Sequence, residues 1–503
     1  MKFIFSTSLL LLLFGEVQSQ VSNPPIVSNE YKAWTTSSEL NRWLLQLSDI
    51  YTVEMRMYQG NNEVNMPVVV IPSVQENPLT VMIIAEQHGD EPAGMEACNL
   101  LISELLNGEL PAWTDSIEWV IIPMVNVEGN DNQTRNKSNG ADLNLDHLLL
   151  SQPETRFVHY IYNRYMPEVF IDLHEYPSES AGENTGLQKR IQQQIGCVTN
   201  LNLMDSKLDE LSHAFILPHV QKNLEKGKLT FSEFWEGTAE EGHKLRKNSV
   251  DINDARHGIG AMGRSLSFVV EGLKGTFRND NIYLRTQAQF KCLIALTEAC
   301  HLKTDEIKKV VMNNRDNVSL QPLSNVSIKM DHFKAVQTVH VPLVFPYRNL
   351  QTGKDSLMDL SSMVFSEIKT IQSIDAPLGY WISKKDKRLI DWIQAHEAGI
   401  FPFSDDKGKA FKSNESEFRL QCISALPEWN TQLVEGIPAP TWKPEWIEMK
   451  GATTKDYIFV STQTLNGLRW IMALEPESMF ALVRYPEFEY LHHQYPILRV
   501  ISR

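Results

Sequence analysis

The chain is long and acidic, and its composition is that of a globular protein. It has 503 residues, of which 42% are hydrophobic and 22% charged, with a formal net charge of −15 at pH 7. This length predicts two domains. The negative charge argues against a nucleic-acid partner, because phosphate binding requires a basic face. No apolar run after the N-terminus is long enough to span a membrane. The oligomeric state is not indicated.

Residues 1–19 have the pattern of a secretory signal peptide. Lys2 gives a short positive start, Leu9 to Leu13 continue an apolar run, and Val17-Gln-Ser19 resembles a cleavage site. The apolar run is too short for a spanning helix. We therefore expect a mature chain that starts near Gln20 and is secreted or periplasmic.

Between residues 66 and 302 the predicted strands and helices alternate along the chain. Apolar runs bounded by turn residues predict strands, and amphipathic segments predict helices. Such alternation indicates an α/β fold with a mostly parallel central sheet and helices on both faces. The predicted strands are Met66–Pro72, Thr80–Ala85, Trp119–Pro123, Val169–Leu173 and Leu266–Glu271, and the predicted helices are Glu91–Leu106, Glu154–Met166, Lys207–Leu224 and Tyr283–Leu302. A further helix, Ser37–Leu47, is predicted before this region.

The character of the sequence changes after residue 303. Residues 304–330 are polar and rich in Asn, Lys and Asp, which predicts a linker. Residues 331–503 contain short β-type runs and few helical patterns, which predicts a smaller β-rich, sandwich-like C-terminal domain. The β-type runs are Val336–Phe345, Leu378–Trp381, Asp456–Ser461 and Ile497–Ile501, and the helical patterns are Lys385–His396 and Leu465–Leu474.

The segments Glu86-Gln-His88-Gly-Asp-Glu91 and Asp172-Leu-His174-Glu175 carry the clearest chemical signal. Each follows an apolar strand, so His88, Glu91 and His174 stand at strand ends, where α/β sheets place ligands. Two imidazoles and one carboxylate form an open zinc site, with a fourth position left for water. Such a water becomes a nucleophile near neutral pH, which predicts a hydrolase.

Glu271 also emerges at the end of a predicted strand, Leu266 to Val270. A carboxylate beside the zinc site can accept a proton from the attacking water and pass it to the leaving amine. Taken alone, Glu271 is better interpreted as a solvated residue that ends a strand.

Four segments occur in an order that resembles the zinc metallocarboxypeptidases of the carboxypeptidase A/B type. The resemblance covers roughly residues 35–303, and it implies a mixed central sheet in a catalytic domain at residues 20–303. The four segments are His88-Gly-Asp-Glu91, Arg135-Asn-Lys-Ser-Asn-Gly-Ala-Asp-Leu-Asn144, Asp172-Leu-His174-Glu175 and Ser267-Phe-Val-Val-Glu271-Gly. Two later segments, Ala376-Pro-Leu-Gly-Tyr-Trp-Ile382 and Leu474-Glu-Pro-Glu-Ser478, are similar to the C-terminal region of large secreted bacterial members.

The resemblance implies a role at each matching position. It implies one Zn²⁺ per chain, held by the three ligands named above, with Glu271 as the general base. Arg135 matches an arginine that faces the polarised carbonyl, where a fixed cation stabilises the oxyanion. Asn144 matches an asparagine that binds the substrate's terminal carboxylate. Asp142 resembles a carboxylate that orients a zinc-bound imidazole.

The chain departs from the family pattern at two places. Leu145 stands where the family has an arginine that binds the C-terminal carboxylate, and leucine cannot donate a hydrogen bond. The loop before the predicted base, residues 251–263, lacks the family's tyrosine. Arg256 and His257 are its polar candidates for substrate binding, and Arg256 is as consistent with a solvated loop residue as with a carboxylate ligand.

The sequence therefore predicts a secreted zinc metallopeptidase that hydrolyses a peptide bond at or near a substrate C-terminus. Leu145 keeps open an amidase or deacylase of the same fold, acting on cell-wall peptides or acylated amino acids. A non-catalytic peptide-binding protein is the third alternative, disfavoured by the presence of three ligands, a base and Arg135.

Overall fold

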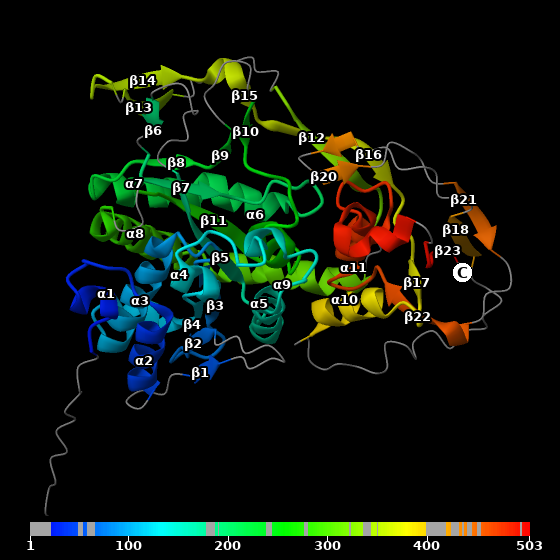
Figure 1. Cartoon of the computed structure of the whole chain (residues 1–503), viewed down its shortest axis with the longest axis horizontal. Coiled ribbons are helices and arrows are strands. Elements are labelled where there is room, and N and C mark those ends of the chain that lie inside the picture. Colours follow the sequence, from blue (N-terminus) through cyan, green and yellow to red (C-terminus); the bar gives the residue numbers. More distant parts are fainter. Residues whose placement is uncertain are drawn as a thin grey trace, which may run out of the picture.

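The computed structural model describes most of the chain (Figure 1). The predicted leader lies outside the described residues, as does most of the predicted strand Val336–Phe345. Among the helices within this part, none combines the length and apolarity needed to cross a membrane. The described residues are 22–48, 54–57, 66–177, 187–189, 191–237, 244–275, 280–320, 323–334, 344–349, 351–398, 419–423, 432–434, 437–439, 445–449, 454–492 and 495–502.

An eight-stranded sheet forms the centre of the structure, in the order β1-β2-β4-β3-β5-β11-β7-β8. The pairs β4–β3, β3–β5, β5–β11 and β7–β8 are parallel. The pairs β1–β2, β2–β4 and β11–β7 are antiparallel, so the prediction of a mixed, mostly parallel sheet is confirmed. The strands are β1 (Glu54–Met57), β2 (Pro67–Ile71), β3 (Leu79–Ala85), β4 (Ile117–Ile122), β5 (Val169–Tyr176), β7 (Gln193–Gly196), β8 (Phe231–Glu233) and β11 (Leu266–Leu273).

Helices cover both faces of this sheet, because alternate residues of its buried strands point to opposite sides. Val81 and Ile83 of β3 pack in one apolar cluster with α2, α3, α7 and α8, whereas Met82 and Ile84 pack in another with α5 and η4. The helices are α1 (Pro25–Ser28), α2 (Ser37–Ser48), α3 (Pro92–Asn107), α4 (Val127–Asn132), α5 (Pro153–Tyr165), α6 (Ser206–Leu211), α7 (Leu217–Lys226) and α8 (Ile282–His301), with the π-helical turns η3 (Ser212–Ile216), between α6 and α7, and η4 (Arg256–Ala261).

The segment 304–330, expected to be a linker, instead contains helix α9 (Thr304–Leu320) and the start of β12 (Val326–Phe333). Its many polar residues obscure an apolar stripe, since Ile307, Val310 and Val311 lie three and four residues apart and pack on the main core. Lys308 extends this attachment by donating to the backbone of Pro78 at 2.5 Å and to Glu168 at 3.1 Å. Residues 304–320 are therefore part of the folded unit.

The rest of the C-terminal region is rich in strands, as predicted. A five-stranded antiparallel sheet has the order β21-β18-β23-β17-β22. One face of this sheet packs on α10 (Lys387–Glu397) and α11 (Gly467–Leu474). Within the described residues this face therefore contacts helices, whereas in a sandwich it would contact a second sheet. The remaining strands are β6 (Leu187–Lys189), β9 (Trp235–Glu236), β10 (Leu245–Lys247), β13 (Val344–Asn349), β14 (Asp355–Asp359), β15 (Val364–Phe365), β16 (Glu367–Ile374), β17 (Gly379–Ser383), β18 (Arg419–Ile423), β19 (Gln432–Val434), β20 (Ile437–Ala439), β21 (Trp446–Met449), β22 (Tyr457–Ser461) and β23 (Ile497–Ser502).

The C-terminal region shares an apolar core with the first part of the chain. One cluster joins Leu148, Ile252 and Met262 to the buried tryptophans Trp392 and Trp470. Polar contacts cross the same boundary. The indole N–H of Trp392 and Nε2 of His396 both donate to the carbonyl of Leu148, at 2.8 and 2.9 Å. The two parts of the chain are consequently joined by buried apolar and polar contacts.

Three buried histidines also line this boundary. His147 and His159 stack with ring centroids 5.4 Å apart, and His159 meets His396 edge-on at 5.3 Å. Burial lowers the pKa of His147 to about 4 and holds the pKa of His159 and His396 well below their usual value. All three imidazoles are therefore neutral at neutral pH.

Replacing Trp470 tests whether the two parts of the chain are one unit. Trp470 is 1% exposed, and its ring lies 5.1 Å from that of Trp392, so Trp470→Ala should lower the free energy of unfolding by about 3–5 kcal/mol. Urea denaturation should show one transition shifted to lower denaturant, and Leu357→Ala, at a 74% exposed position, should shift it little. A separate transition for the first part of the chain, unmoved by the substitution, would contradict the shared core.

Candidate metal centre

His88 and Glu91 lie on the short connection between β3 and α3. Helix α3 begins at Pro92, where the missing N–H does no harm, and Glu91 is the residue just before it. The connection passes very close to α4, since a Cβ on Gly89 would lie 2.0 Å from the backbone carbon of Gly129. Only glycine fits at that position, so the backbone between the two side chains is tightly fixed.

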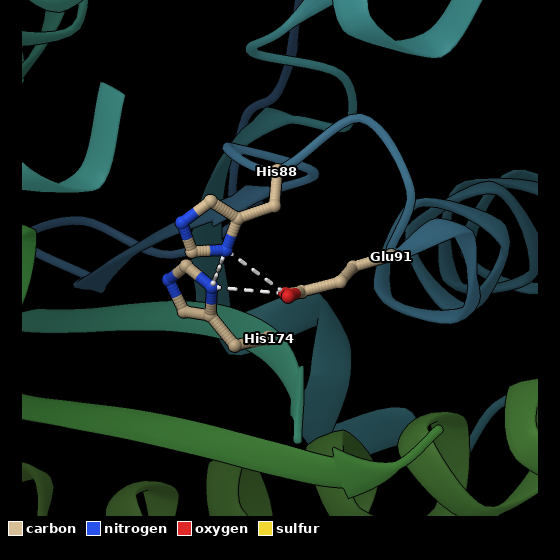
Figure 2. A group of neighbouring side chains, drawn as sticks. All are labelled: His88, Glu91 and His174. Carbon is tan, nitrogen blue, oxygen red and sulfur yellow. Dashed lines mark hydrogen bonds and ion pairs between the residues drawn. The ribbon is translucent and has the colours of Figure 1, made fainter. Parts of the chain in front are cut away.

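The side chains of His88, Glu91 and His174 converge on one point (Figure 2). The Nδ1 atoms of the two histidines are 3.1 Å apart, and Oε2 of Glu91 lies 3.1 Å from Nδ1 of His88 and 3.2 Å from Nδ1 of His174. Ligands of a tetrahedral zinc ion, at about 2.0–2.1 Å from the metal, are about 3.3–3.4 Å apart. The donor set and its spacing therefore fit a zinc ion with one further position.

The outer nitrogen of each histidine is bound by a carboxylate. Nε2 of His88 donates to Asp142 at 3.1 Å, and Nε2 of His174 donates to Asp172 at 2.9 Å. A carboxylate only accepts, so each ring carries a proton on Nε2 and directs its Nδ1 atom toward Glu91. This arrangement orients an imidazole for a metal and makes it a stronger ligand.

The cluster holds an excess of negative charge. Burial would lower the pKa of His174, but Asp172 and Glu91 hold it well above its usual value. Burial would likewise raise the pKa of Glu91, but His88 and His174 hold it well below. The site therefore attracts positive charge, and a divalent cation would supply it without requiring both imidazoles to be protonated.

Glu271 lies beside His174 because β11 and β5 are parallel neighbours in which these two residues are directly paired. Leu266, Phe268 and Val270 of β11 pack on the α3 and α8 side, so Glu271 points to the opposite face, which His174 shares. Burial raises the pKa of Glu271 to about 7, and the negative charge of Glu91 adds to this while His174 opposes it. A carboxyl group with this pKa can accept a proton near neutral pH.

Arg135 and Asn144 lie on the same side as the cluster. Nη1 of the exposed Arg135 is 2.6 Å from Oε1 of Glu91, and its Nε is 3.9 Å from Asp142. Oδ1 of Asn144 accepts from Nε2 of Gln87 at 3.1 Å and from the backbone of Ala255 at 3.2 Å. These bonds fix the amide and leave its NH₂ group available as a donor, with no partner for it among the described residues.

Arg256 and His257 lie within η4 and are buried. Arg256 donates to Asn248 at 3.1 Å and to the carbonyl of Cys197 at 3.2 Å, and it forms an ion pair with Asp254 at 3.1 Å. Nδ1 of His257 also contacts Asp254, at 3.0 Å. The two side chains are thus held by protein partners, and a direct role in substrate binding stays a prediction.

Three further residues belong to the site, although sequence patterns did not assign them roles. Nε2 of Gln87 donates to Asp172, and Oε1 of Gln87 accepts from Nε2 of His147 at 2.7 Å. The orienting role of Asp172 was accessible from the sequence, because residues two apart on a strand share a face and Asp172 precedes His174 by two. The contact between Gln87 and His147 depends on tertiary structure and has no local signal.

Comparison with known proteins agrees with this site. Residues 41–181 match the family described as Zinc carboxypeptidase. A probable carboxypeptidase 2 from Arthroderma benhamiae is 26% identical over 202 residues, which are 38% of this chain and 37% of the relative. Carboxypeptidase 2 from Trichophyton equinum is 25% identical over 203 residues, covering 39% and 36%. The chain thus spans little more than a third of the length of the curated relatives it matches.

Solved structures with some similarity carry related names. A metallo-carboxypeptidase from Pseudomonas aeruginosa matches with 17% identity and a TM-score of 0.41, over 55% of this chain and 71% of that protein. A carboxypeptidase A from Helicoverpa armigera matches with 14% identity and a TM-score of 0.43, over 55% and 75%.

Asp172→Asn tests the orienting carboxylate. Asparagine keeps the shape but removes the negative charge that fixes the His174 ring, so zinc affinity should fall about 10–100-fold. Competition with a chromogenic chelator measures this affinity. Asp115→Asn, at an exposed position, is the matched control and should bind zinc like the unmodified protein. Equal affinity in both variants would show that Asp172 does not support the site.

The raised pKa of Glu271 predicts a pH-dependent stability of the metal-free protein. Its carboxyl has a pKa of about 7 when folded and an ordinary value of 4.5, so the folded state retains the proton longer. Stability from this group is complete below pH 4.5 and is lost as the pH rises to about 7. Relative to Glu271→Gln, the unmodified protein should therefore become less stable over this range, as measured by urea denaturation in EDTA. A difference that stays constant with pH would contradict the shift.

Proposed function

We propose that this chain is a secreted zinc hydrolase of the carboxypeptidase type, with one zinc ion per chain, which cleaves the amide bond at or near the C-terminus of a peptide. The observation that carries the proposal is the convergence of two Nδ1 atoms and one carboxylate oxygen, mutually 3.1–3.2 Å apart, beside Glu271. The match of residues 41–181 to the zinc carboxypeptidase family supports it.

The ligands of the metal are His88, Glu91 and His174. A bound zinc ion supplies a Lewis acid, which polarises a carbonyl and makes water acidic near neutral pH. Glu271 takes the proton of the attacking water and delivers it to the leaving nitrogen, so it acts first as a base and then as an acid.

Arg135 stabilises the negative charge that develops on the scissile carbonyl oxygen. Its guanidinium is exposed and already lies beside the metal ligand Glu91, so a substrate carbonyl at the metal would lie within its reach. A single donor to an oxyanion contributes about 3–4 kcal/mol to catalysis. The free NH₂ group of Asn144 would bind a substrate oxygen on the same side.

The substrate's C-terminal carboxylate has a weaker binding site than the family pattern provides. Leu145 replaces the expected arginine, and its side chain is 50% exposed and next to Asn144. This apolar surface specifically favours the second candidate, an amidase or deacylase of the same fold whose substrate has no free carboxylate at that point. Arg256 could compensate only by giving up one of its present partners, because Asp254 offsets its charge.

The leader predicted at residues 1–19 supports a location outside the cytoplasm.

All five cysteines lie in the described part of the chain and are free, so no disulfide contributes to stability there.

A panel of peptides tests the proposal. The zinc-loaded protein should release the last residue of peptides with a free C-terminus, and Glu271→Gln should lower kcat about 10²–10⁴-fold with little change in KM. Glu210→Gln, an exposed glutamate, is the matched control. Faster cleavage of C-terminally amidated or acylated compounds would favour the amidase. No hydrolysis of any amide by a zinc-loaded protein that binds peptide would refute both candidates.

A further inference from the structure

A polar cavity of about 440 Å³ lies far from the candidate metal centre. It is open to solvent on one side and is lined by residues of the segment Asn202–Leu208, by the end of η4 and the turn that leads to β11, and by the second half of α9 with Leu323 and Ser324. This turn adjoins the first residue of β11, Leu266, whereas Glu271 lies five residues further along the same strand. At about 3.3 Å per residue, the cavity and Glu271 are separated by roughly 17 Å of strand.

Arg264 projects from this turn with an unusual backbone. Its φ is +66°, in the left-handed region that glycine or asparagine usually occupies at the end of a helical turn. The conformation is fixed by hydrogen bonds from Arg264 N–H to Ala261 and from Ser265 N–H to Gly260. A non-glycine residue held in such a conformation often marks a functional position.

The guanidinium of Arg264 lacks the partners that other partly buried arginines have. Its Nε is buried without a hydrogen-bond partner, and no ion pair links Arg264 to any of the described residues. By contrast, Arg285 donates to both oxygens of Glu175, at 2.8 Å each. Burial lowers the pKa of Arg264, and the negative charge of Asp205 opposes this only in part, so a hydrogen-bond acceptor at the guanidinium would stabilise its charge further.

The negative charge of Asp205 favours the charged form of Arg264, but the two side chains form no ion pair in the described part of the chain. Asp205, the acidic residue in its wall, accepts from the backbone of Lys207 and Leu208 at 2.9 and 3.1 Å and from Asn314 at 2.8 Å. These contacts anchor α6 and leave one lone-pair direction of Asp205 unused. The wall thus presents an unpaired guanidinium near a carboxylate that is only partly occupied.

The cavity also has an apolar floor. Leu203, Leu208 and Val318 line it and are each less than 9% exposed. The exposed side chains of Asn317 and Ser324 complete the rim and can donate to a bound oxygen. The volume is sufficient for a small organic acid with a short apolar group.

We propose that this cavity binds a small carboxylate, and that a free amino acid with an apolar side chain is its best ligand. Arg264 would bind the carboxylate through two parallel N–H donors, a geometry that guanidinium and carboxylate share. Asp205 would accept from the ammonium group, and Leu203, Leu208 and Val318 would contact the side chain. This site is independent of the proposed hydrolysis.

The test measures thermal stability with L-leucine, sodium acetate or sodium phosphate as the probe. L-Leucine should raise the Tm of the full chain in a concentration-dependent manner, and acetate should raise it less, because acetate lacks the ammonium and the side chain. Arg264→Asn should reduce the affinity for L-leucine, measured by calorimetry, about ten-fold or more. Lys207→Asn removes the same charge from an exposed residue on α6 and should bind like the unmodified protein.

Asparagine suits a left-handed backbone, so Arg264→Asn should fold, and Arg264→Gly provides a second variant for the same position. Both variants should keep the unmodified rate of peptide hydrolysis, because Arg264 is remote from Glu271. The proposal is overturned if L-leucine leaves the Tm unchanged, if phosphate stabilises the protein more than either carboxylate, or if Arg264→Asn binds L-leucine normally, which would place the ligand elsewhere. Absence of hydrolysis in every variant would count against the proposed function and leave this test unaffected.

Discussion

The parallel pairing of β5 with β11 is the constraint on which the candidate metal centre depends. It places Glu271 directly beside His174 although 96 positions of sequence separate them, and strand alternation turns both side chains to the same face. The neighbouring strand β3 then delivers His88 and Glu91 to the same edge of the sheet. A slip of one residue in either pairing would turn His174 or Glu271 into the opposite core, so the register of three buried strands fixes the geometry of the site.

Much of this arrangement was predictable from the sequence, because its signals are local. The apolar runs before His88, His174 and Glu271 indicated strands ending at one edge, and the alternation of strands and helices indicated a sheet covered on both faces. The structure moves these element boundaries by only a few residues. The roles of the residues in catalysis remain predictions, whereas their convergence at one edge of the sheet is a property of the fold.

Other features were not predictable, for physical reasons that differ from case to case. The composition of helix α9 predicts a linker, because its solvent-facing residues outnumber the apolar stripe that holds it on the core. The link from Asp172 through Gln87 to His147 joins segments that meet only after folding. The sequence around Arg256 predicts a loop residue available to substrate, but Arg256 forms an ion pair with Asp254. The two residues are only two positions apart, and this spacing by itself does not indicate an ion pair.

The contacting imidazoles of His147, His159 and His396 make the stability of this boundary depend on pH. All three remain neutral inside the fold but would ionise on unfolding below their ordinary pKa of 6.5. Acidification therefore favours separation of the surfaces they join, with a combined dependence on proton concentration that one histidine could not provide. Acid therefore destabilises the boundary between the two parts of the chain. The loop that carries Asp142 and Asn144 continues into His147, so this loop would lose its contacts at the boundary as well.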